Sequence, residues 1–415
     1  MKLLILGGSN IQLNTVRKAK EKGHTVIVSD YYEDAPAKQI CDHGEPASTF
    51  DVEANIEVAE KYGIDGVLTM GTDQPVYTVA RVAEKCALPA LVTVDTAKAA
   101  TNKKIMKDIF TSNNIPTVDY RIISNDFTGR DIDGISFPVV VKPLDSQGQR
   151  GVYKLDSVEG IRGAFDEVLS FSREKEILVE EYYPSDEITV SGWVSKGRLF
   201  LLTITDRICY SNYPHIGICI AHDFPSKYME QYYFEIESIS RQITKAFNIL
   251  EGPVYFQMLI GDRGIKVNEI ACRIGGAYED EFIPLVTGVD ISDMLIEASL
   301  GKSYDIEALE GYSLKDNSKL VSVEMIFAAP CRIKEMNDME RVKQLPGVVQ
   351  ALYNFKPGHV IGSIKNATAR AGYVIITGEN QTALRENRRR VYENLEILDE
   401  SGKNRIINSC RGRME

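Results

Sequence analysis

Residues 139–152, VVVKPLDSQGQRGV, join a β-branched run to a lysine and then to a loop with two glycines. The run Val139–Val141 predicts a buried strand, which Lys142 closes. An unpaired ammonium group at the end of a buried strand is costly, so Lys142 needs an anionic partner. Gly148 and Gly151 let successive backbone N–H groups approach an anion closely. The stretch therefore predicts a phosphate site; the alternative is a surface turn with a lysine that extends into solvent.

The composition is that of a globular protein with two to four domains. The chain has 415 residues, of which 44% are hydrophobic and 26% charged. A formal net charge of −11 disfavours nonspecific binding to nucleic acid or to an anionic membrane. Seven cysteines without a Cys-x-x-Cys spacing indicate neither a disulfide framework nor a zinc site. No apolar run is long enough for a signal peptide or a membrane span, so we expect a cytoplasmic protein.

The first hundred residues alternate between strand and helix patterns. Repeated β-α-β units of this kind predict a doubly wound, parallel, Rossmann-like sheet. Its ligand side lies beyond the carboxyl ends of the strands, at Gly7–Asn10, Asp30 and Gly71–Gln74. The expected strands are Lys2–Leu6, Thr25–Ser29 and Gly66–Met70, with helices at Gln12–Lys22 and from Pro75 to about Cys86.

The rest of the chain predicts an α+β module followed by a smaller α/β unit. We place the domains at residues 1–94, 95–320 and 321–415, with a small lobe of the central domain at about 114–188. In the central domain we expect helices Asp95–Asn113, Ser157–Ser170 and Met229–Phe247, and strands Tyr120–Ile123, Ile177–Glu180 and Glu187–Val194. In the last domain we expect strands Val321–Phe327, Pro346–Leu352 and Gly372–Thr377, and the helix Gln381–Leu395.

A second chemical signal lies in residues 254–276. Residues 254–260 and 265–270 predict a hairpin about a Gly-Asp-Arg-Gly turn, which puts Gln257 opposite Asn268 or Glu269. Oxygen-bearing side chains that converge on a sheet suit a Mg²⁺ site on a nucleotide, although an ordinary half-exposed hairpin gives the same pattern. Arg273 follows with a glycine pair, and arginine is suited to a transferring phosphoryl group.

These signals occur in one order along the chain: Asn102-Lys103, Val141-Lys142, Ser146-x-Gly148-x-x-Gly151, Val179-Glu180-Glu181-Tyr182, Glu187, Gln257 and Glu269–Gly276. That order, over residues from about 95 to 300, resembles the ATP-grasp superfamily of carboxylate ligases. The flanking regions resemble the flanking domains of the purine-biosynthesis and biotin-carboxylase-like branches.

The resemblance implies a role for each matching residue. Lys103 and Lys142 would contact the ATP phosphates, under a flexible loop that contains Ser146, Gly148 and Gly151. The adenine would lie against Glu180 and the backbone of Glu181 and Tyr182, with the ribose on Glu187. Glu269 and Gln257 would hold Mg²⁺, and Arg273 with Lys142 would be catalytic. The implied reaction forms an acyl phosphate and ADP, after which an amine displaces phosphate.

Two positions depart from the family pattern. Gln257 stands where the family usually has a carboxylate, and Ala271 where it has an asparagine. We therefore expect one Mg²⁺ and find no charged ligand for a second. For the substrate, the candidates are Asp73, His215, Gly275 and Gly276. The segment Thr205–His222, which also holds Arg207, Tyr210 and Tyr213, suits either a substrate-facing loop or a packed surface excursion.

The leading hypothesis is an ATP-dependent carboxylate–amine ligase that acts on amino acids or related metabolites. A purine-pathway ligase resembling phosphoribosylglycinamide synthetase is the nearest alternative, although no second basic pocket for a phosphoribosyl group is evident. Gln257 and Ala271 also suit a non-catalytic ATP-binding module. Gly7-Gly8 and Asp30 alone suggest a nicotinamide-dependent oxidoreductase. The expected partners are small molecules, and a homodimer is left open.

Overall fold

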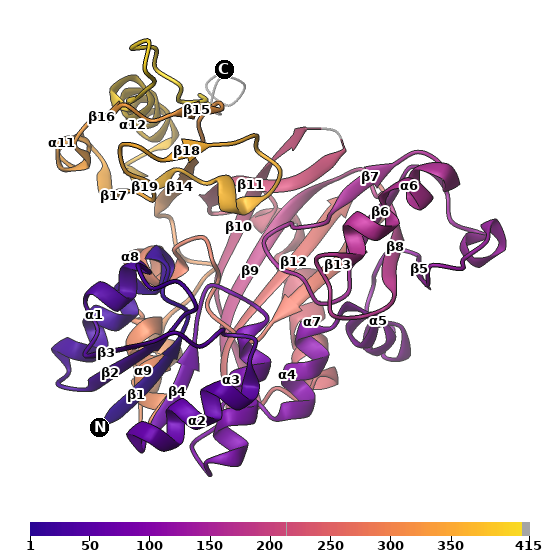
Figure 1. The fold of residues 1–415 in the computed structure, drawn as a ribbon, viewed down its shortest axis with the longest axis horizontal. Helices are drawn as coiled ribbons and strands as arrows, with labels where there is room; N and C mark the ends of the chain where they lie inside the picture. Colours follow the sequence, from indigo (N-terminus) through magenta and orange to yellow (C-terminus); the bar gives the residue numbers. More distant parts are fainter. Residues whose placement is uncertain (213, 409–415) are drawn as a thin grey trace.

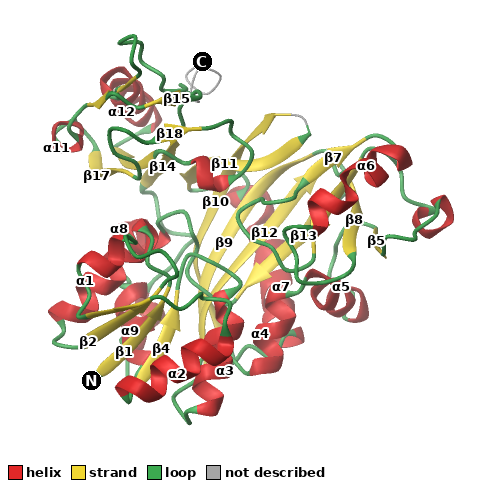
Figure 2. Cartoon of the chain, viewed as in Figure 1, coloured by secondary structure: helices red, strands yellow, loops and turns green. Residues whose placement is uncertain are grey.

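A computed structural model describes residues 1–212 and 214–408 of the chain. Three regions meet around a central sheet (Figure 1). The N-terminal region lies on one side of this sheet and the C-terminal region above it, while the small lobe, with β5 (Tyr120–Ile123) and α6 (Val158–Leu169), forms the opposite end of the sheet (Figure 2). Among the described residues, no helix combines the length and the apolar character that a membrane crossing requires.

The N-terminal region is a parallel four-stranded sheet in the order β3-β2-β1-β4. Alternate residues of β1 enter different cores, because successive side chains of a strand point to opposite faces: Leu3 and Ile5 pack with α1, and Leu4 and Leu6 with α2 and α3. The doubly wound prediction is confirmed. The strands are β1 (Lys2–Leu6), β2 (Thr25–Ser29), β3 (His43–Glu45) and β4 (Gly66–Thr69), and the helices α1 (Leu13–Glu21), α2 (Val52–Tyr62) and α3 (Pro75–Lys85).

The helix predicted over Asp95–Asn113 is two helices, α4 (Val94–Thr101) and α5 (Lys103–Ser112). Asn102 breaks it with an extended backbone, and its side-chain oxygen accepts hydrogen bonds from the N–H groups of Lys104 and Ile105. An asparagine at this position satisfies the free donors of a new helix start. The break turns α5 so that Lys103 begins a helix instead of lying within one.

The central sheet runs β13-β12-β9-β10-β11-β7-β6-β8-β5. Its small-lobe strands are β5 (Tyr120–Ile123), β6 (Val139–Pro143), β7 (Tyr153–Leu155) and β8 (Ile177–Glu181), covered by α6 (Val158–Leu169). The large-lobe strands are β9 (Ser185–Ser195), β10 (Arg198–Asn212), β11 (His215–Phe224), β12 (Gly252–Gly261) and β13 (Gly264–Ala271). The helices of this lobe are α7 (Met229–Ala246), α8 (Glu279–Thr287), α9 (Ile291–Ser299) and α10 (Ile306–Gly311).

The interpretation of Thr205–His222 as a loop is wrong. Strand β10 extends to Asn212 and β11 begins at His215, and the two form an antiparallel pair in which Arg207 lies opposite His222. The pattern was misread because buried positions of this strand pair carry polar side chains, among them Thr205, Arg207 and His222. Tyr213 lies outside the described residues.

The C-terminal region extends the same sheet. Strand β14 (Leu320–Ile326) pairs with β11 on one side and with β19 (Gly372–Gly378) on the other, and β17 (Val348–Tyr353) follows. Helix α12 (Gln381–Asn394) packs on β19 over a separate apolar core. The division at residues 94 and 320 stays a prediction, and the sheet is continuous across the second boundary. The remaining α-helix and strands of this region are α11 (Met339–Lys343), β15 (Cys331–Arg332), β16 (Glu335–Met336), β18 (Val360–Ile361) and β20 (Ile397–Leu398).

Candidate active site

A cavity of about 360 Å³ lies between the small lobe and the large lobe of the central sheet. Strands β6 and β8 form one wall, and β9, β10, β12 and β13 the other. Ten of the predicted site residues line this cavity: Asp73, Lys103, Lys142, Ser146, Gly148, Glu180, Glu181, Tyr182, Glu187 and Glu269. Six predicted residues do not: Gly151, His215, Gln257, Arg273, Gly275 and Gly276.

Glu180 carries a buried negative charge between two lysines. Its Oε1 lies 2.5 Å from the Nζ of Lys107, and its Oε2 lies 2.5 Å from the Nζ of Lys142. Burial alone would raise the pKa of Glu180, but the charges of the two lysines outweigh burial and lower it to about 2. Glu180 is therefore ionised at neutral pH.

The two lysines differ in their surroundings. Lys142 lines the cavity and also donates a hydrogen bond to the Oδ1 of Asn268 at 2.8 Å. Burial lowers its pKa, but Glu180 and then Glu269 raise it above the ordinary value. Lys107 lies behind the cavity wall, where burial is the larger effect and lowers its pKa.

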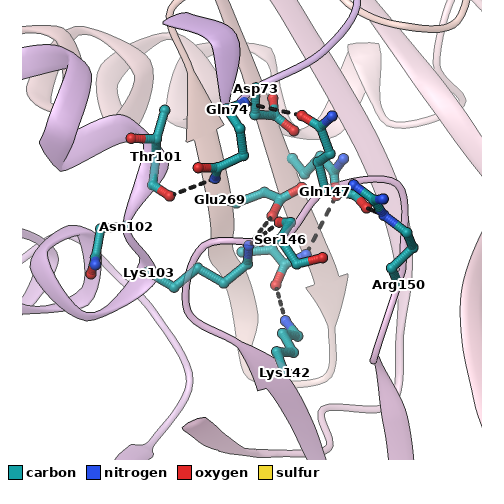
Figure 3. A network of polar contacts seen from close by, with 12 residues as sticks. Asp73, Gln74, Thr101, Asn102, Lys103, Lys142, Ser146, Gln147, Arg150 and Glu269 are labelled. Carbon is teal, nitrogen blue, oxygen red and sulfur yellow. Dashed lines mark hydrogen bonds and ion pairs between the residues drawn. The ribbon is translucent and has the colours of Figure 1, made fainter. Parts of the chain in front are cut away.

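The glycine loop is held over the cavity by contacts from several regions. Lys103 donates to the backbone carbonyl of Ser146 at 3.0 Å, and the N–H of Gln74 donates to the Oε1 of Gln147 at 3.0 Å (Figure 3). From the C-terminal region, the N–H of Ala367 donates to the carbonyl of Gly148 at 3.1 Å. The Oγ of Ser146 is buried and has no hydrogen-bond partner among the described residues. Such an orphaned hydroxyl fits a site that receives a polar ligand.

Gly148 and Gly151 both have the positive φ angle that favours glycine, at +66° and +72°. They differ in their surroundings. A Cβ on Gly151 would lie 2.8 Å from side-chain atoms of Pro143 and Phe171, whereas one on Gly148 would meet only the Cβ of Ala367 at 3.9 Å. Gly151 therefore packs the end of the loop, and Gly148 faces the cavity.

The predicted metal residues are neighbours on the hairpin. Gln257 pairs with Glu269 in the register of β12 and β13, as predicted. Glu269 and Asn268 line the cavity, whereas Gln257 is buried behind them, where its Oε1 accepts a hydrogen bond from Asn268 at 3.4 Å. No group of three or more His, Cys, Asp or Glu residues within the described chain could hold a metal ion. One carboxylate with an amide fits a Mg²⁺ that phosphate oxygens coordinate as well.

Glu187 and Arg207 form an ion pair at the floor of the cavity. The Nη1 of Arg207 lies 2.5 Å from the Oε2 of Glu187, and its Nη2 donates to the carbonyl of Gly217 at 2.9 Å. Both residues line the cavity, and the Glu187 carboxylate keeps contact with it. Glu187 is thus held in place before any ligand arrives.

Arg273 reaches the cavity only through Asp73. Its Nη2 lies 2.6 Å and its Nε 2.8 Å from the Oδ1 of Asp73, which belongs to the N-terminal region. The glycine pair behind Arg273 serves close packing: a Cβ on Gly276 would lie 2.4 Å from the carbonyl oxygen of Gly71, and the N–H of Gly275 donates to Glu279 at 2.9 Å. The Arg273 turn and the Gly71–Asp73 loop, which the sequence analysis treated separately, therefore meet in a contact between the N-terminal region and the central sheet.

The two histidines of the β10–β11 hairpin lie apart from the reacting groups. His215 packs against the ring of Tyr153, with 5.1 Å between ring centroids. His222 is buried, with its Nδ1 3.0 Å from the Oγ1 of Thr205. Burial, then the charges of Arg207 and Arg370, hold the pKa of His222 well below its ordinary value. It is neutral at physiological pH.

The sequence analysis missed Lys107, Gln147 and Arg370. Lys107 carried a detectable signal, because it lies on the apolar face of its helix between Met106 and Phe110, where a lysine needs a buried partner. Arg370 donates to the carbonyl of Gly276 at 3.1 Å from the C-terminal region, a contact that only the tertiary fold creates.

Residues 135–281 match the family model described as "ATP-grasp domain". The chain contains an ATP-grasp domain. The match covers the strand and loop of the ATP-grasp motif, the β8 carboxylates and the Arg-x-Gly-Gly turn. Residues 324–398 match a second model, "L-amino acid ligase C-terminal domain 2".

Relatives of this ATP-grasp chain are distant in sequence and close in fold. Dapdiamide A synthase of Enterobacter agglomerans is 21% identical over 60% of each chain. The formate-dependent phosphoribosylglycinamide formyltransferase of Bacteroides thetaiotaomicron is 28% identical over 46% of this chain and 50% of its own. The matches thus span about half to three fifths of these relatives. The crystal structure of an L-amino acid ligase from Bacillus licheniformis superposes with a TM-score of 0.81 at 18% identity, over 96% of this chain and 98% of that one.

Proposed function

We propose that this protein is an ATP-dependent ligase that activates a substrate carboxylate as an acyl phosphate and couples it to an amine. The observation that carries the proposal is the convergence of Lys103, Lys142 and Glu269 on one cavity. Two cations suit a polyphosphate, and the carboxylate suits its metal ion. An amino acid or a related small metabolite is the proposed substrate, a choice supported by the match to the ligase C-terminal domain.

The cavity offers a group for each part of ATP. We assign the phosphates to Lys103, Lys142 and the loop at Gly148, where the unpartnered hydroxyl of Ser146 gives a further donor. The adenine is assigned to Glu180 and to the backbone of Glu181 and Tyr182 on β8. The ribose hydroxyls are assigned to Glu187, whose carboxylate Arg207 already orients.

The chemistry is carried by positioning and by charge neutralisation. An oxygen of the substrate carboxylate attacks the γ-phosphorus, and the bond from that phosphorus to the β-γ bridging oxygen breaks, which yields ADP and an acyl phosphate. The amine then attacks the acyl carbon, loses a proton, and expels inorganic phosphate as the amide forms. Lys142 balances charge on the phosphoryl group, and Arg273, which lies behind the cavity wall, acts through Asp73, whose carboxylate it orients at the wall.

One Mg²⁺ fits the residues present. Glu269 and Asn268 face the cavity and would hold it beside the phosphates, while Gln257 supports Asn268 from behind. When bound, the ion would neutralise phosphate charge and polarise the phosphoryl group. A second ion has no further carboxylate of the hairpin at the cavity, because Asp262 lies in the exposed turn.

A purine-pathway ligase is the second candidate. The 28% identity with the formyltransferase favours it, since that relative is named for a phosphoribosylglycinamide substrate. Such a substrate requires a second anion site for its phosphate. Four of the five cations that line the cavity, Lys103, Lys142, Arg207 and Lys227, pair with carboxylates, and the fifth, Arg150, donates to the backbone carbonyl of Gln147.

A phosphate-release screen tests the proposal. Purified protein with ATP and Mg²⁺ is given pairwise pools of amino acids, and release of ADP and phosphate is measured. Separate reactions contain glycine with phosphoribosylamine, and formate with phosphoribosylglycinamide. We expect at least one amino-acid pair to stimulate release. Release in the phosphoribosyl reactions alone would favour the second candidate, and no stimulation by any pair would contradict the amino-acid proposal.

A further inference from the structure

Lys107 is a buried lysine that makes no contact with the cavity. Its side chain is 1% exposed, whereas that of Lys142 is 12% exposed. It lies on α5, within the apolar face formed by Met106 and Phe110. A charge in such a place is destabilising unless it is paired, so its partners explain its presence.

The partners of Lys107 hold its ammonium group in one position. Its Nζ lies 2.5 Å from the Oε1 of Glu180 and donates to the Oγ1 of Thr117 at 2.7 Å. Thr117 in turn donates to the carbonyl of Val267 on β13 at 3.0 Å. Lys107 is thus tied to β8 and β13 from α5, on the side of Glu180 that faces away from the cavity.

Glu180, Lys107 and Lys142 together contain one anion and two cations. Glu180 is neutralised by Lys107 alone, so the charge of Lys142 is in excess. Lys142 can leave Glu180 without exposing an unpaired buried carboxylate. If Lys107 were apolar, the same movement would separate a buried ion pair, and the desolvated Glu180 would oppose it.

We propose that Lys107 is a positioning residue that neutralises Glu180 permanently and so leaves Lys142 available for the phosphates of the nucleotide. The inference rests on the proposed function, because it takes the cavity to be a nucleotide site. The two lysines then have different roles: Lys107 keeps Glu180, the carboxylate assigned to the adenine, ionised, and Lys142 binds the phosphates of the ligand. A space-filling role for Lys107 is the rival explanation.

Binding of magnesium tripolyphosphate, measured by titration calorimetry, tests whether Lys107 keeps Lys142 available for phosphate. This probe is the phosphate chain of ATP without the nucleoside, so its affinity reports on Lys142 and not on adenine recognition. The variants are Lys107→Met, which keeps the length of the side chain, Glu180→Gln, and the double variant. Lys104→Met is the control, since Lys104 lies on the same helix but is 43% exposed and pairs with Glu176.

We expect Lys107→Met to weaken binding at least tenfold, because Lys142 becomes the only partner of Glu180. Glu180→Gln should bind at least as tightly as the wild type. The double variant, from which both buried charges are gone, should return to within about threefold of it, and Lys104→Met should not change affinity. Recovery in the double variant separates the proposal from the rival, since loss of packing is not repaired by a second substitution.

Wild-type affinity in Lys107→Met, or a double variant as weak as Lys107→Met, would overturn the inference. Should Lys107→Met not fold, the comparison of the wild type with the other two variants decides: a tenfold weaker affinity in either one contradicts the proposal, and wild-type affinity in both supports it. If the wild type binds neither tripolyphosphate nor ADP, the proposed function fails together with the inference.

Discussion

Lys142 illustrates how a single charge can be held ready at the edge of a cavity. Lys142 pairs with Glu180 and donates a hydrogen bond to Asn268. Because Lys107 also pairs with Glu180, that carboxylate stays neutralised without Lys142. Removal of Lys142 therefore leaves no buried charge without a partner. Its contribution to the reaction and its contribution to stability are separable.

We predict that Lys142→Ala lowers kcat/KM for ATP-dependent phosphate release by about 100-fold or more, the size expected when a donor to a developing charge is lost. The midpoint of thermal unfolding should change by only a few degrees, because Lys107 still neutralises Glu180. Steady-state assays of both proteins, with unfolding followed by circular dichroism, check the two parts. Activity within threefold of the wild type would contradict the phosphate assignment.

At this scale, residues whose position in the fold depends on neighbours in the sequence were predictable. Lys142 follows a β-branched run, and Glu269 lies opposite Gln257 about a glycine turn, so pattern alone placed both. The Asp73–Arg273 pair joins residues 200 positions apart. Both residues were predicted as site residues, but no local pattern indicates that they bind each other or that Arg273 stays behind the wall.

The loop between β6 and β7 lines the cavity with residues 146–150. Its two glycines share the same backbone region but not the same surroundings, since only Gly151 lies against Pro143 and Phe171. This difference allows backbone strain and packing to be separated within one loop.

We predict that Gly148→Ala costs about 1–2 kcal/mol, the strain of a left-handed alanine. Gly151→Ala should cost roughly 1–3 kcal/mol more, because its methyl group forces Pro143 or Phe171 to move. Urea unfolding of the two variants measures the difference. Equal costs would mean that Phe171 is free to move aside and that the end of the loop is not packed as described.

Element types were largely predictable, and the exceptions have physical causes. The break between α4 and α5 was not predicted because only the backbone of Asn102 leaves the helical conformation. The helical sequence pattern resumes at Lys103, so the pattern shows no interruption. The β10–β11 hairpin was missed because its buried positions hold the polar residues Arg207, Thr205 and His222, of which only Arg207 lines the cavity. Polar side chains on a buried sheet face were thus mistaken for a loop.

On the scale of the whole molecule, the N-terminal sheet is joined to the ATP-grasp domain by a buried carboxyl group. The Oδ2 of Asp280 accepts a hydrogen bond from Asn14 on α1 at 2.9 Å, and its Oδ1 has no hydrogen-bond partner among the described residues. Burial, and then the charge of Glu281, raise the pKa of Asp280 from 3.8 to about 7. The folded protein therefore keeps a proton that the unfolded chain releases.

Because the folded state binds this proton more tightly, Asp280 lowers stability progressively as pH rises from about 4 to about 7. The amide of Asp280→Asn does not titrate. We predict that the variant gains stability relative to the wild type between pH 5 and pH 8, by up to about 3 kcal/mol. Urea unfolding of both proteins at the two pH values measures this difference, from which other titrating groups cancel. A difference that does not change with pH would contradict the buried, protonated state of Asp280.

The order of the regions along the chain could be predicted, but their arrangement around one sheet could not. Strand β14 joins β11 across about 100 residues of sequence. The apolar pattern of residues 321–327 indicates a strand and does not name its neighbour. Contacts such as Ala367 with Gly148, which bring the C-terminal region to the glycine loop, accompany that pairing.

The most direct test of the central claim follows the oxygen atoms of the carboxylate. The protein is incubated with ATP, Mg²⁺ and amino acids whose carboxylates carry ¹⁸O, and the released phosphate is analysed by mass spectrometry. Activation as an acyl phosphate transfers one carboxylate oxygen to the γ-phosphorus, so we predict phosphate with a single ¹⁸O in an amount equal to the ADP formed. ADP release that yields only unlabelled phosphate, or no amino-acid-dependent release at all, would contradict the account.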